Sequence, residues 1–204
     1  MRRGLLESIH LYVISDRRRM GEDPAALARA LLDLDGLMFQ WREKDQSSAR
    51  NEAALKPLEG VTAPLLINGD VTLASRLTIG VHLPEDGIAT AEARSILGPS
   101  ALIGRSTHGI DAARRAEEEG ADFVTFGPIY DTESKRRYGP PQGIDRLRDL
   151  CRAIALPVFA LGGIDASRVR ECRTAGAHGV AAIGAIWDAP NPRIAASSLL
   201  AAWR

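Results

Sequence analysis

The sequence predicts a single α/β domain that folds as a closed (β/α)8 TIM barrel over residues 1–204, and three observations indicate this. Short apolar runs alternate strictly with longer amphipathic runs, eight such pairs follow one another, and no linker or low-complexity tract interrupts them. Strict alternation indicates a parallel sheet with right-handed crossovers. Eight units without a long insertion favour a closed barrel, and a doubly wound open sheet is the alternative. A length of 204 residues is near the lower limit for the barrel.

The expected strands are short runs rich in Val, Ile and Phe. They cover residues 9–15, 37–42, 64–68, 79–83, 101–105, 122–127, 157–161 and 179–183.

The expected helices fill the intervals between these strands. They cover residues 24–34, 47–58, 70–77, 89–97, 109–119, 143–154, 166–175 and 192–203. The pattern is clearest in 109–119, where Ala112, Ala113 and Ala116 share one face and charged residues occupy the other. Gly120 then ends this helix.

The charge balance excludes a general affinity for polyanions. Lys plus Arg and Asp plus Glu both count 26, so the net charge is zero, and we expect neither a nucleic-acid nor a membrane partner. No apolar run approaches the roughly 20 residues that span a bilayer, and residues 1–7 lack the apolar centre of a signal peptide. Cys151 and Cys172 lie in expected helices without metal-ligand spacing, which indicates reduced thiols. We therefore expect a cytoplasmic protein, and homo-oligomer formation stays open.

Polar residues gather where the expected strands end, which is where a parallel barrel places its active site. Each alone can be explained as a helix cap or a solvated loop residue, whereas together they indicate a functional rim. His82 can be either a packed barrel residue or an acid–base group. The long stretch 130–143, rich in Gly, Pro and basic residues, is typical of a substrate loop. The rim residues are Asp16, Arg42, Glu43, Lys44, Asn68, Asp70, His82, Ser106, Thr107, His108, Asp131, Thr132 and Lys135.

Glycines after the last two expected strands predict a phosphate site. Gly162 and Gly163 follow strand 157–161, and Gly184 follows strand 179–183. Glycines let backbone N–H groups approach an anion, and a following helix N-terminus adds partial positive charge. These two strands carry the usual phosphate site of the barrel. The alternative is that the glycines only permit tight turns.

The segment Gln40-Trp41-Arg42-Glu43-Lys44 predicts a second anion site. Strand alternation places Gln40, Arg42 and Lys44 on one side, and Trp41 and Glu43 on the other. An amide, a guanidinium and an ammonium that converge at the barrel mouth suit a diphosphate. Lys135 could approach the same anion from the long loop. The alternative is an exposed strand end in which the basic residues pair with Glu43.

In these segments and in their order, the chain from about His10 to Trp187 resembles the thiamine-phosphate synthase and TenI family. Other phosphate-binding barrels would share only the glycine segment, so several matches in the same order are specific. The matching segments are 11–16, 40–44, 66–68, 80–83, 103–108, 126–132, Lys135 and 160–164.

The resemblance implies two phosphorylated substrates, a pyrimidine diphosphate and a thiazole phosphate, which the synthases join with loss of pyrophosphate. It places Ser106 and Thr107 near the leaving group. It assigns catalytic roles to Lys135, Ser106 and His108. The implied binding residues are Gln40, Arg42, Lys44, Asn68 and Lys135 for the diphosphate and Gly162, Gly163 and Gly184 for the thiazole phosphate, and Thr107 and Thr132 are further candidates for substrate or phosphate binding.

Two departures from the synthase pattern shape the functional prediction. Gly69 and Gly87 stand where synthases carry metal-binding Asp residues, although Asp70 and Asp86 each lie one residue away. The histidine of thiazole tautomerases is replaced by Pro128. We therefore predict a TenI-like, thiazole-phosphate-binding protein, tautomerase-like and without a required cofactor. The alternatives are a thiamine-phosphate synthase that uses Mg²⁺, with Asp70 and Asp86 as ligands, and a non-catalytic binding or regulatory protein.

Overall fold

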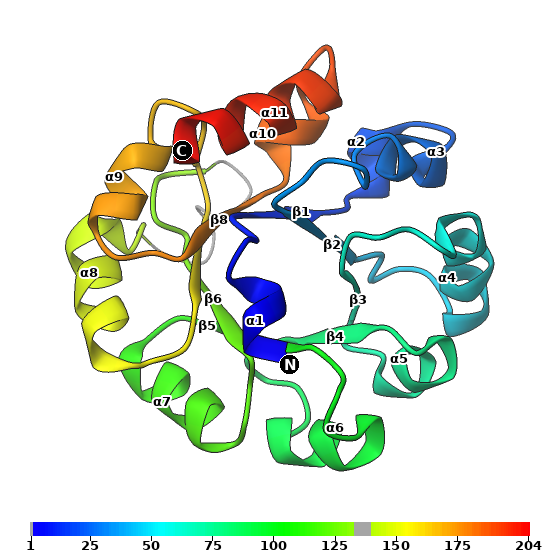
Figure 1. The fold of residues 1–204 in the computed structure, drawn as a ribbon, viewed down its shortest axis with the longest axis horizontal. Helices are drawn as coiled ribbons and strands as arrows, with labels where there is room; N and C mark the ends of the chain where they lie inside the picture. Colours follow the sequence, from blue (N-terminus) through cyan, green and yellow to red (C-terminus); the bar gives the residue numbers. More distant parts are fainter. Residues whose placement is uncertain (1, 133–139) are drawn as a thin grey trace.

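Eight parallel strands close into one barrel in sequence order, β1 to β8 (Figure 1). The structure is a computed structural model that describes residues 2–132 and 140–204, with the side chains of residues 2 and 3 left aside. The predicted TIM barrel is confirmed, and the open sheet is excluded because β1 pairs with β8 as well as with β2. The strands are β1 (Leu11–Ile14), β2 (Leu37–Trp41), β3 (Leu65–Asn68), β4 (Gly80–Leu83), β5 (Ile103–Thr107), β6 (Phe123–Phe126), β7 (Val158–Leu161) and β8 (Gly179–Ala182).

Most helices form a ring outside the strands (Figure 1). They are α1 (Arg2–Leu6), α2 (Arg17–Met20), α3 (Pro24–Arg29), α4 (Ser48–Leu55), the 3-10 helix η1 (Lys56–Leu58), α5 (Val71–Leu77), α6 (Thr90–Leu97), α7 (Ile110–Glu118), α8 (Gly143–Ala153), α9 (Val169–Thr174), α10 (Gly184–Trp187) and α11 (Pro192–Trp203).

The helices differ from the prediction at their ends and in three short additions. The helix expected over 24–34 ends at Arg29. The one expected over 47–58 divides at Lys56, because Pro57 cannot donate to the helical ladder and starts a tighter turn. The short helices α1, α2 and α10 are too brief to show an apolar period, so the sequence did not predict them.

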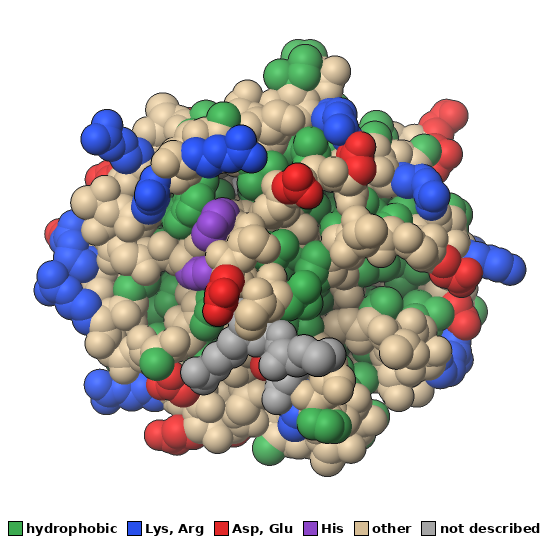
Figure 2. Space-filling view, viewed as in Figure 1, with side chains coloured by type: hydrophobic (Ala, Val, Ile, Leu, Met, Phe, Trp, Pro, Cys, Tyr) green, Lys and Arg blue, Asp and Glu red, His purple; other side chains and the backbone are tan. Residues whose placement is uncertain are grey.

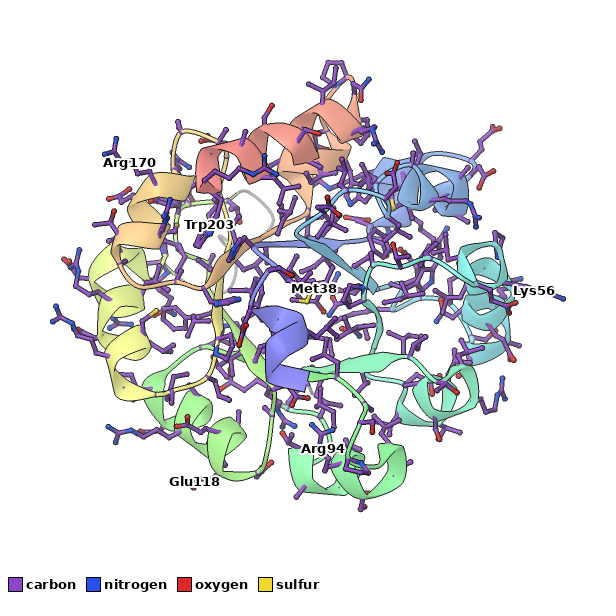
Figure 3. The ribbon with its side chains drawn as sticks, in the orientation of Figure 1. Met38, Lys56, Arg94, Glu118, Arg170 and Trp203 are labelled. Carbon is purple, nitrogen blue, oxygen red and sulfur yellow. The ribbon has the colours of Figure 1, made fainter. Side chains whose placement is uncertain are left out.

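Inward and outward side chains of the strands form two apolar cores. The outward residues pack against the helices, and the inward ones fill the barrel. Tyr12, Phe123 and Phe159 form an aromatic layer across the interior, with ring centroids 5.4–6.0 Å apart and edge-to-face geometry. Such pairs stabilise a core beyond the area that they bury. Met38 lies in the same interior cluster, near the middle of the ring in Figure 3.

Helix α1 closes the end of the barrel at which the strands begin, and this end faces the viewer in Figures 1 and 2. Leu6 is buried in the barrel interior. His178 Nε2 donates to the Leu6 carbonyl at 2.8 Å, and His10 Nδ1 donates to the His178 carbonyl at 2.9 Å. His10 also stacks on Trp203, with ring centroids 5.2 Å apart. Both histidines thus lie at the end opposite the predicted site.

A cavity of about 670 Å³ also lies at this end, between η1, α5, α6 and the starts of β3, β4 and β5. Its lining is mainly aliphatic and includes Leu58, Pro64, Leu77, Ile79 and Leu97. The cavity therefore does not coincide with the polar rim. Within residues 2–132 and 140–204, no helix is long and apolar enough to cross a membrane.

Candidate active site

A polar layer lies above the aromatic layer, on inward positions near the carboxyl ends of the strands. Gln40 Nε2 donates to the Tyr12 hydroxyl at 2.9 Å. His82 Nε2 lies 3.0 Å from Ser106 Oγ and 3.5 Å from Thr125 Oγ1. The Tyr12 and His82 rings are 5.6 Å apart, so the two hydrogen-bonded groups adjoin each other. Residues from β1, β2, β4, β5 and β6 thus form a continuous polar floor beneath the barrel mouth.

His82 is a neutral imidazole in this floor. Burial lowers its pKa from 6.5 to about 3, and the charges of Arg42 and Arg105 act in the same direction. His82 Nδ1 has no hydrogen-bond partner in the described part of the chain. The ring therefore orients the Ser106 hydroxyl instead of carrying a charge.

The end of β2 is fixed by a buried carboxylate that does not neutralise its basic neighbours. Glu43 is 7% exposed and accepts hydrogen bonds from the Ser15 hydroxyl and, at 3.2 Å, from the Arg17 backbone N–H. The Arg42 backbone N–H donates to Ser15 Oγ at 2.8 Å. Burial raises the pKa of Glu43, and the hydrogen bonds from Ser15 and Arg17 oppose that shift. Glu43 thus ties β1 to β2, so the alternative in which it pairs with the neighbouring basic side chains is wrong.

Arg42 and Lys44 are consequently available to an external anion. Arg42 is half-buried and Lys44 is exposed. Neither side chain forms an ion pair with any residue that the structure describes. The predicted inward placement is confirmed for Gln40, which lies in the floor, and it stays a prediction for Arg42.

The end of β3 carries two polar side chains, the amide of Asn68 and the carboxylate of Asp70, and only the carboxylate is hydrogen-bonded to the described residues. Asn68 pairs in register with His82 and is half-buried, and its side chain makes no hydrogen bond to the described residues. Gly69 has φ +73°, a left-handed conformation that glycine adopts without strain. Asp70 caps α5, accepting from the Leu73 N–H at 2.9 Å and from the Ser48 hydroxyl. The expected helix-starting role of Asp70 is confirmed.

The loop after β4 holds Asp86 on the surface. Asp86 is exposed in a turn that the Gly87 N–H closes by donating to the Pro84 carbonyl at 3.0 Å. Arg105 fixes this loop, since its guanidinium donates to the carbonyls of Glu85, Gly87 and Ile88. Across the described ranges, no group of three or more His, Cys, Asp or Glu residues is arranged to hold a metal.

The last two residues of β5, Ser106 and Thr107, and the following His108 have three different environments. Ser106 faces the mouth, where it contacts His82. Thr107 faces the wall of the barrel; it is 1% exposed and donates to the Thr125 carbonyl at 3.1 Å. Its side chain is therefore not available for the predicted contact with the leaving group, because neighbouring strand residues point to opposite faces. His108 lies on the exposed rim, with Nδ1 donating to the Gly127 carbonyl at 2.8 Å and Nε2 3.7 Å from Glu85.

The turn after β7 has a backbone that only glycine fits. Gly162 and Gly163 have φ +104° and +67°. A Cβ on Gly162 would lie 2.6 Å from Pro128 Cβ, and one on Gly163 would lie 2.8 Å from Tyr130 Cβ. The carbonyls of Leu161 and Gly162 accept from the N–H groups of Ile129 and Tyr130 at 2.9 and 3.0 Å. Because carbonyl and N–H of a trans peptide point in opposite directions, the N–H groups of Gly162 and Gly163 face away from the β6–α8 loop.

Two further predicted phosphate contacts lie at the ends of β6 and β8. Gly184 is the first residue of α10, and a Cβ there would lie 2.9 Å from Asp188 Oδ2, which pairs with Arg19. Thr132 lies beside the double-glycine turn, with Cγ2 3.3 Å from the position of a Gly163 Cβ. The Thr132 hydroxyl is buried and has no hydrogen-bond partner among residues 2–132 and 140–204. Lys135 lies outside the described residues.

The closed ring of eight parallel strands places the chain in the class of (β/α)8-barrel proteins, and its double-glycine turn lies after β7, where such barrels frequently bind phosphate. The family model described as thiamine monophosphate synthase matches residues 11–186. The chain belongs to this family.

Individual relatives agree with this assignment. A protein of Geobacter sulfurreducens, whose name assigns it provisionally to thiamine-phosphate synthase, is 44% identical over 94% of this chain and 92% of its own length. The thiamine-phosphate synthase of Salinibacter ruber is 37% identical over 94% of this chain and 87% of its own length. The structure of thiamine phosphate pyrophosphorylase from Pyrococcus furiosus superposes with a TM-score of 0.81 and 26% identity, covering 98% of this chain and 97% of that one. These names favour the synthase alternative over the tautomerase-like prediction.

Sequence reasoning missed several residues that shape the site. Tyr12 is a hydroxyl-bearing residue within an apolar strand, a weak signal that alternation alone could have assigned to the interior. Ser15 and Thr125 carry no comparable signal, because their roles depend on partners 28 and 43 residues away. Glu43 was placed on the correct side, but its partners were not foreseen.

Proposed function

We propose that this protein is a thiamine-phosphate synthase, a transferase that joins a pyrimidine diphosphate to a thiazole phosphate and releases pyrophosphate. The observation that carries the proposal is the pair Arg42 and Lys44, which no described carboxylate neutralises while Glu43 is held by Ser15 and Arg17. A tautomerase acts on one phosphorylated substrate and needs one anion site. A synthase needs two, and the ends of β2 and β7 supply them. The names of the relatives support the same activity.

The two anion sites lie at different points of the strand ring. The thiazole phosphate would bind the N–H groups of the double-glycine turn, beside the hydroxyl of Thr132, which no described residue engages. The diphosphate would bind Arg42, Lys44 and the amide of Asn68, with Lys135 from the loop outside the described residues. The two binding regions are separated by β1 and β8 in the closed ring, which leaves the polar floor between them for the pyrimidine.

The chemical step breaks the bond between the pyrimidine methylene carbon and the diphosphate oxygen, and the electron pair leaves with pyrophosphate. The thiazole nitrogen then forms the new bond to that carbon and becomes cationic, as a thiazolium. No proton changes place in this balance, so the reaction requires no general base. This agrees with a floor in which His82 is neutral and buried. Positive side chains at the mouth stabilise the charge that develops on the leaving group.

Ser106 is the floor residue best placed to assist departure. When His82 Nε2 carries the ring proton, it donates to Ser106 Oγ, and the serine hydroxyl hydrogen is free to reach a phosphate oxygen. His108 Nδ1 is occupied by the Gly127 carbonyl, so only Nε2 can meet a ligand. Thr107 takes no part, because its hydroxyl is bonded inside the barrel wall.

The ends of β3 and β4 carry the carboxylates that would hold a Mg²⁺ ion. One carboxylate oxygen of Asp70 caps a helix and the other accepts from Ser48, while Asp86 is exposed on the next loop. Mg²⁺ commonly binds one or two carboxylates together with substrate phosphates. These residues therefore fit Mg²⁺ only together with a bound diphosphate. A bound Mg²⁺ would supply neutralising charge to the diphosphate.

Turnover of the two substrates tests the proposal. Purified protein would be mixed with the pyrimidine diphosphate, the thiazole phosphate and Mg²⁺, and thiamine phosphate and pyrophosphate would be measured in equal amounts. Omission of either substrate is the control and should give neither product. Tautomerisation of a thiazole phosphate without condensation would overturn the proposal in favour of the tautomerase. Tight thiazole-phosphate binding without any turnover would support a non-catalytic binding protein.

A further inference from the structure

We propose that Arg168 is a positioning residue that sets the double-glycine turn for phosphate binding. The inference rests on the proposed function, since it assumes that this turn receives the thiazole phosphate. Arg168 immediately precedes α9 and is half-buried. Nothing in its sequence surroundings, Asp165-Ala166-Ser167-Arg168, distinguishes it from an ordinary solvent-facing helix start.

Arg168 completes a series of three carbonyl contacts along the turn. The carbonyls of Leu161 and Gly162 are bound by backbone N–H groups of the β6–α8 loop. The third carbonyl, that of Gly163, accepts instead from the Arg168 guanidinium. A side chain therefore fixes the last peptide plane of the turn, where the loop backbone no longer reaches.

The orientation of this carbonyl determines the orientation of the next N–H group. In a planar trans peptide the Gly163 carbonyl and the Ile164 N–H point in opposite directions. Holding the carbonyl toward Arg168 turns the Ile164 N–H away from the guanidinium, as Ile129 and Tyr130 do for the two preceding N–H groups. Without this contact the peptide plane between Gly163 and Ile164 could rotate widely, because Gly163 lacks a Cβ and its φ is left-handed.

Tyr130 and Glu171 hold Arg168 in place. The guanidinium carbon lies 4.5 Å from the centroid of the Tyr130 ring, a cation–π contact. The Tyr130 hydroxyl donates to the Glu171 carboxylate on α9, which fixes the ring. Tyr130 Cβ also limits the space above Gly163. The brace formed by Tyr130, Arg168 and Glu171 thus connects α9 to both sides of the turn.

Four variants separate positioning from simple stabilisation of α9. Arg168→Ala removes the contact, Arg168→Lys keeps a charge without the planar donor, and Tyr130→Phe removes only the link to Glu171. Arg170→Ala is the matched control, because Arg170 is exposed and points outward from the same helix (Figure 3). Each protein would be titrated calorimetrically with inorganic phosphate, and KM for each substrate, kcat and the thermal midpoint would be measured.

We expect Arg168→Ala to weaken inorganic phosphate binding and to raise KM for the thiazole phosphate about tenfold, the loss of one oriented contact. KM for the pyrimidine diphosphate should stay within about twofold, which a general loss of structure would not allow. Arg168→Lys and Tyr130→Phe should give smaller changes in the same direction. Arg170→Ala should match the wild type.

Unchanged phosphate affinity in folded Arg168→Ala would overturn the inference, as would equal rises in both KM values. If Arg168→Ala does not fold, Arg168→Lys and Tyr130→Phe decide the question in the same assays. If the wild type binds phosphate more tightly than Arg168→Ala but forms no thiamine phosphate, the proposed function would be refuted and the inference would stand. If the wild type forms thiamine phosphate and the Arg168 variants bind phosphate as tightly as it does, the proposed function would stand and the inference would be refuted. A wild type that binds no phosphate would overturn the inference as well.

Discussion

The two ends of this barrel use polar residues in opposite ways. At the end closed by α1, His10 and His178 each donate to a backbone carbonyl, and burial lowers the pKa of His178, so it favours the neutral form. At the other end, the side chains of Arg42 and Asn68 and the Thr132 hydroxyl have no partner among the described residues. Buried polar groups normally find partners because an unmade hydrogen bond is costly. The first end is therefore built for stability, and the second has its polar groups arranged for a ligand.

The aromatic layer between the two ends should carry the largest effect on stability. Phe159 is fully buried, with ring centroids 5.4 Å from Phe123 and 5.5 Å from His178. We expect Phe159→Ala to lower the free energy of unfolding by about 3–5 kcal/mol, because it leaves a cavity that the rigid ring of strands cannot fill. Urea denaturation would measure the change. Ile194→Ala, at a side chain 64% exposed, is the control and should change stability by less than about 0.5 kcal/mol.

A stability loss below about 1 kcal/mol for Phe159→Ala would show that the interior collapses around the missing ring. The contrast between a structural end and a ligand-binding end would then lose its physical basis.

The basic cluster after β2 should show the opposite behaviour. We expect Arg42→Ala to weaken pyrophosphate binding by about 1.5–3 kcal/mol, the worth of a charge-assisted contact, with stability changed by no more than about 1 kcal/mol. Calorimetric titration and thermal denaturation would measure the two effects. Arg50→Ala removes the same charge from an exposed position on α4 and should change neither. Lower stability with unchanged pyrophosphate affinity would make the cluster structural.

Acid should destabilise the polar floor through His82. Its pKa is about 3 in the folded protein and 6.5 when exposed, so the unfolded chain binds the proton more readily between these values. The stability contributed by neutral His82 is complete above pH 6.5 and falls as the pH is lowered through this window, by about 2 kcal/mol at pH 5. Urea denaturation from pH 7 to 4 should therefore show a shallower decline for His82→Gln than for the wild type.

His108→Gln is the control for this pH series, since His108 is on the exposed rim. It should follow the wild-type curve, and the contribution of His178 is common to all three proteins. Parallel curves for His82→Gln and the wild type would mean that His82 is accessible to protons in the folded state.

The smallest effect should be that of Mg²⁺ alone. We expect no measurable Mg²⁺ binding in calorimetry without pyrophosphate, because Asp70 is engaged by Leu73 and Ser48 and no described cluster completes the coordination. With pyrophosphate present, Mg²⁺ should bind, and Asp70→Asn combined with Asp86→Asn should weaken it. Glu118→Gln, on an exposed side chain that points outward in Figure 3, controls for the loss of charge. Tight binding to the protein alone would contradict the expectation.

The candidate site divides into residues that local pattern could locate and residues that it could not. The turn at Gly162 and Gly163 was predictable because a glycine pair at a strand end is typical of a tight turn, and both residues have a left-handed φ; the phosphate site there stays a prediction. The inward direction of Gln40 was predictable because side chains alternate between the two faces along a strand. Ser106 and Thr107 were predicted alike, although one faces the mouth and the other the wall. The expected strand ended at residue 105, whereas β5 extends to Thr107, so alternation along the strand turns these two side chains to opposite faces.

The sequence by itself determined the barrel, because alternation of apolar strands and amphipathic helices is a local property repeated along the chain. It also determined which residues stand at the strand ends. The tertiary structure decided which of these residues are hydrogen-bonded to other residues of the chain and which are not. Glu43 is held by Ser15, 28 residues away, and the Gly163 carbonyl by Arg168 at the start of the next helix. Such contacts depend on barrel closure and on side-chain direction, since hydrogen bonds require alignment within a few tenths of an ångström that no sequence period encodes.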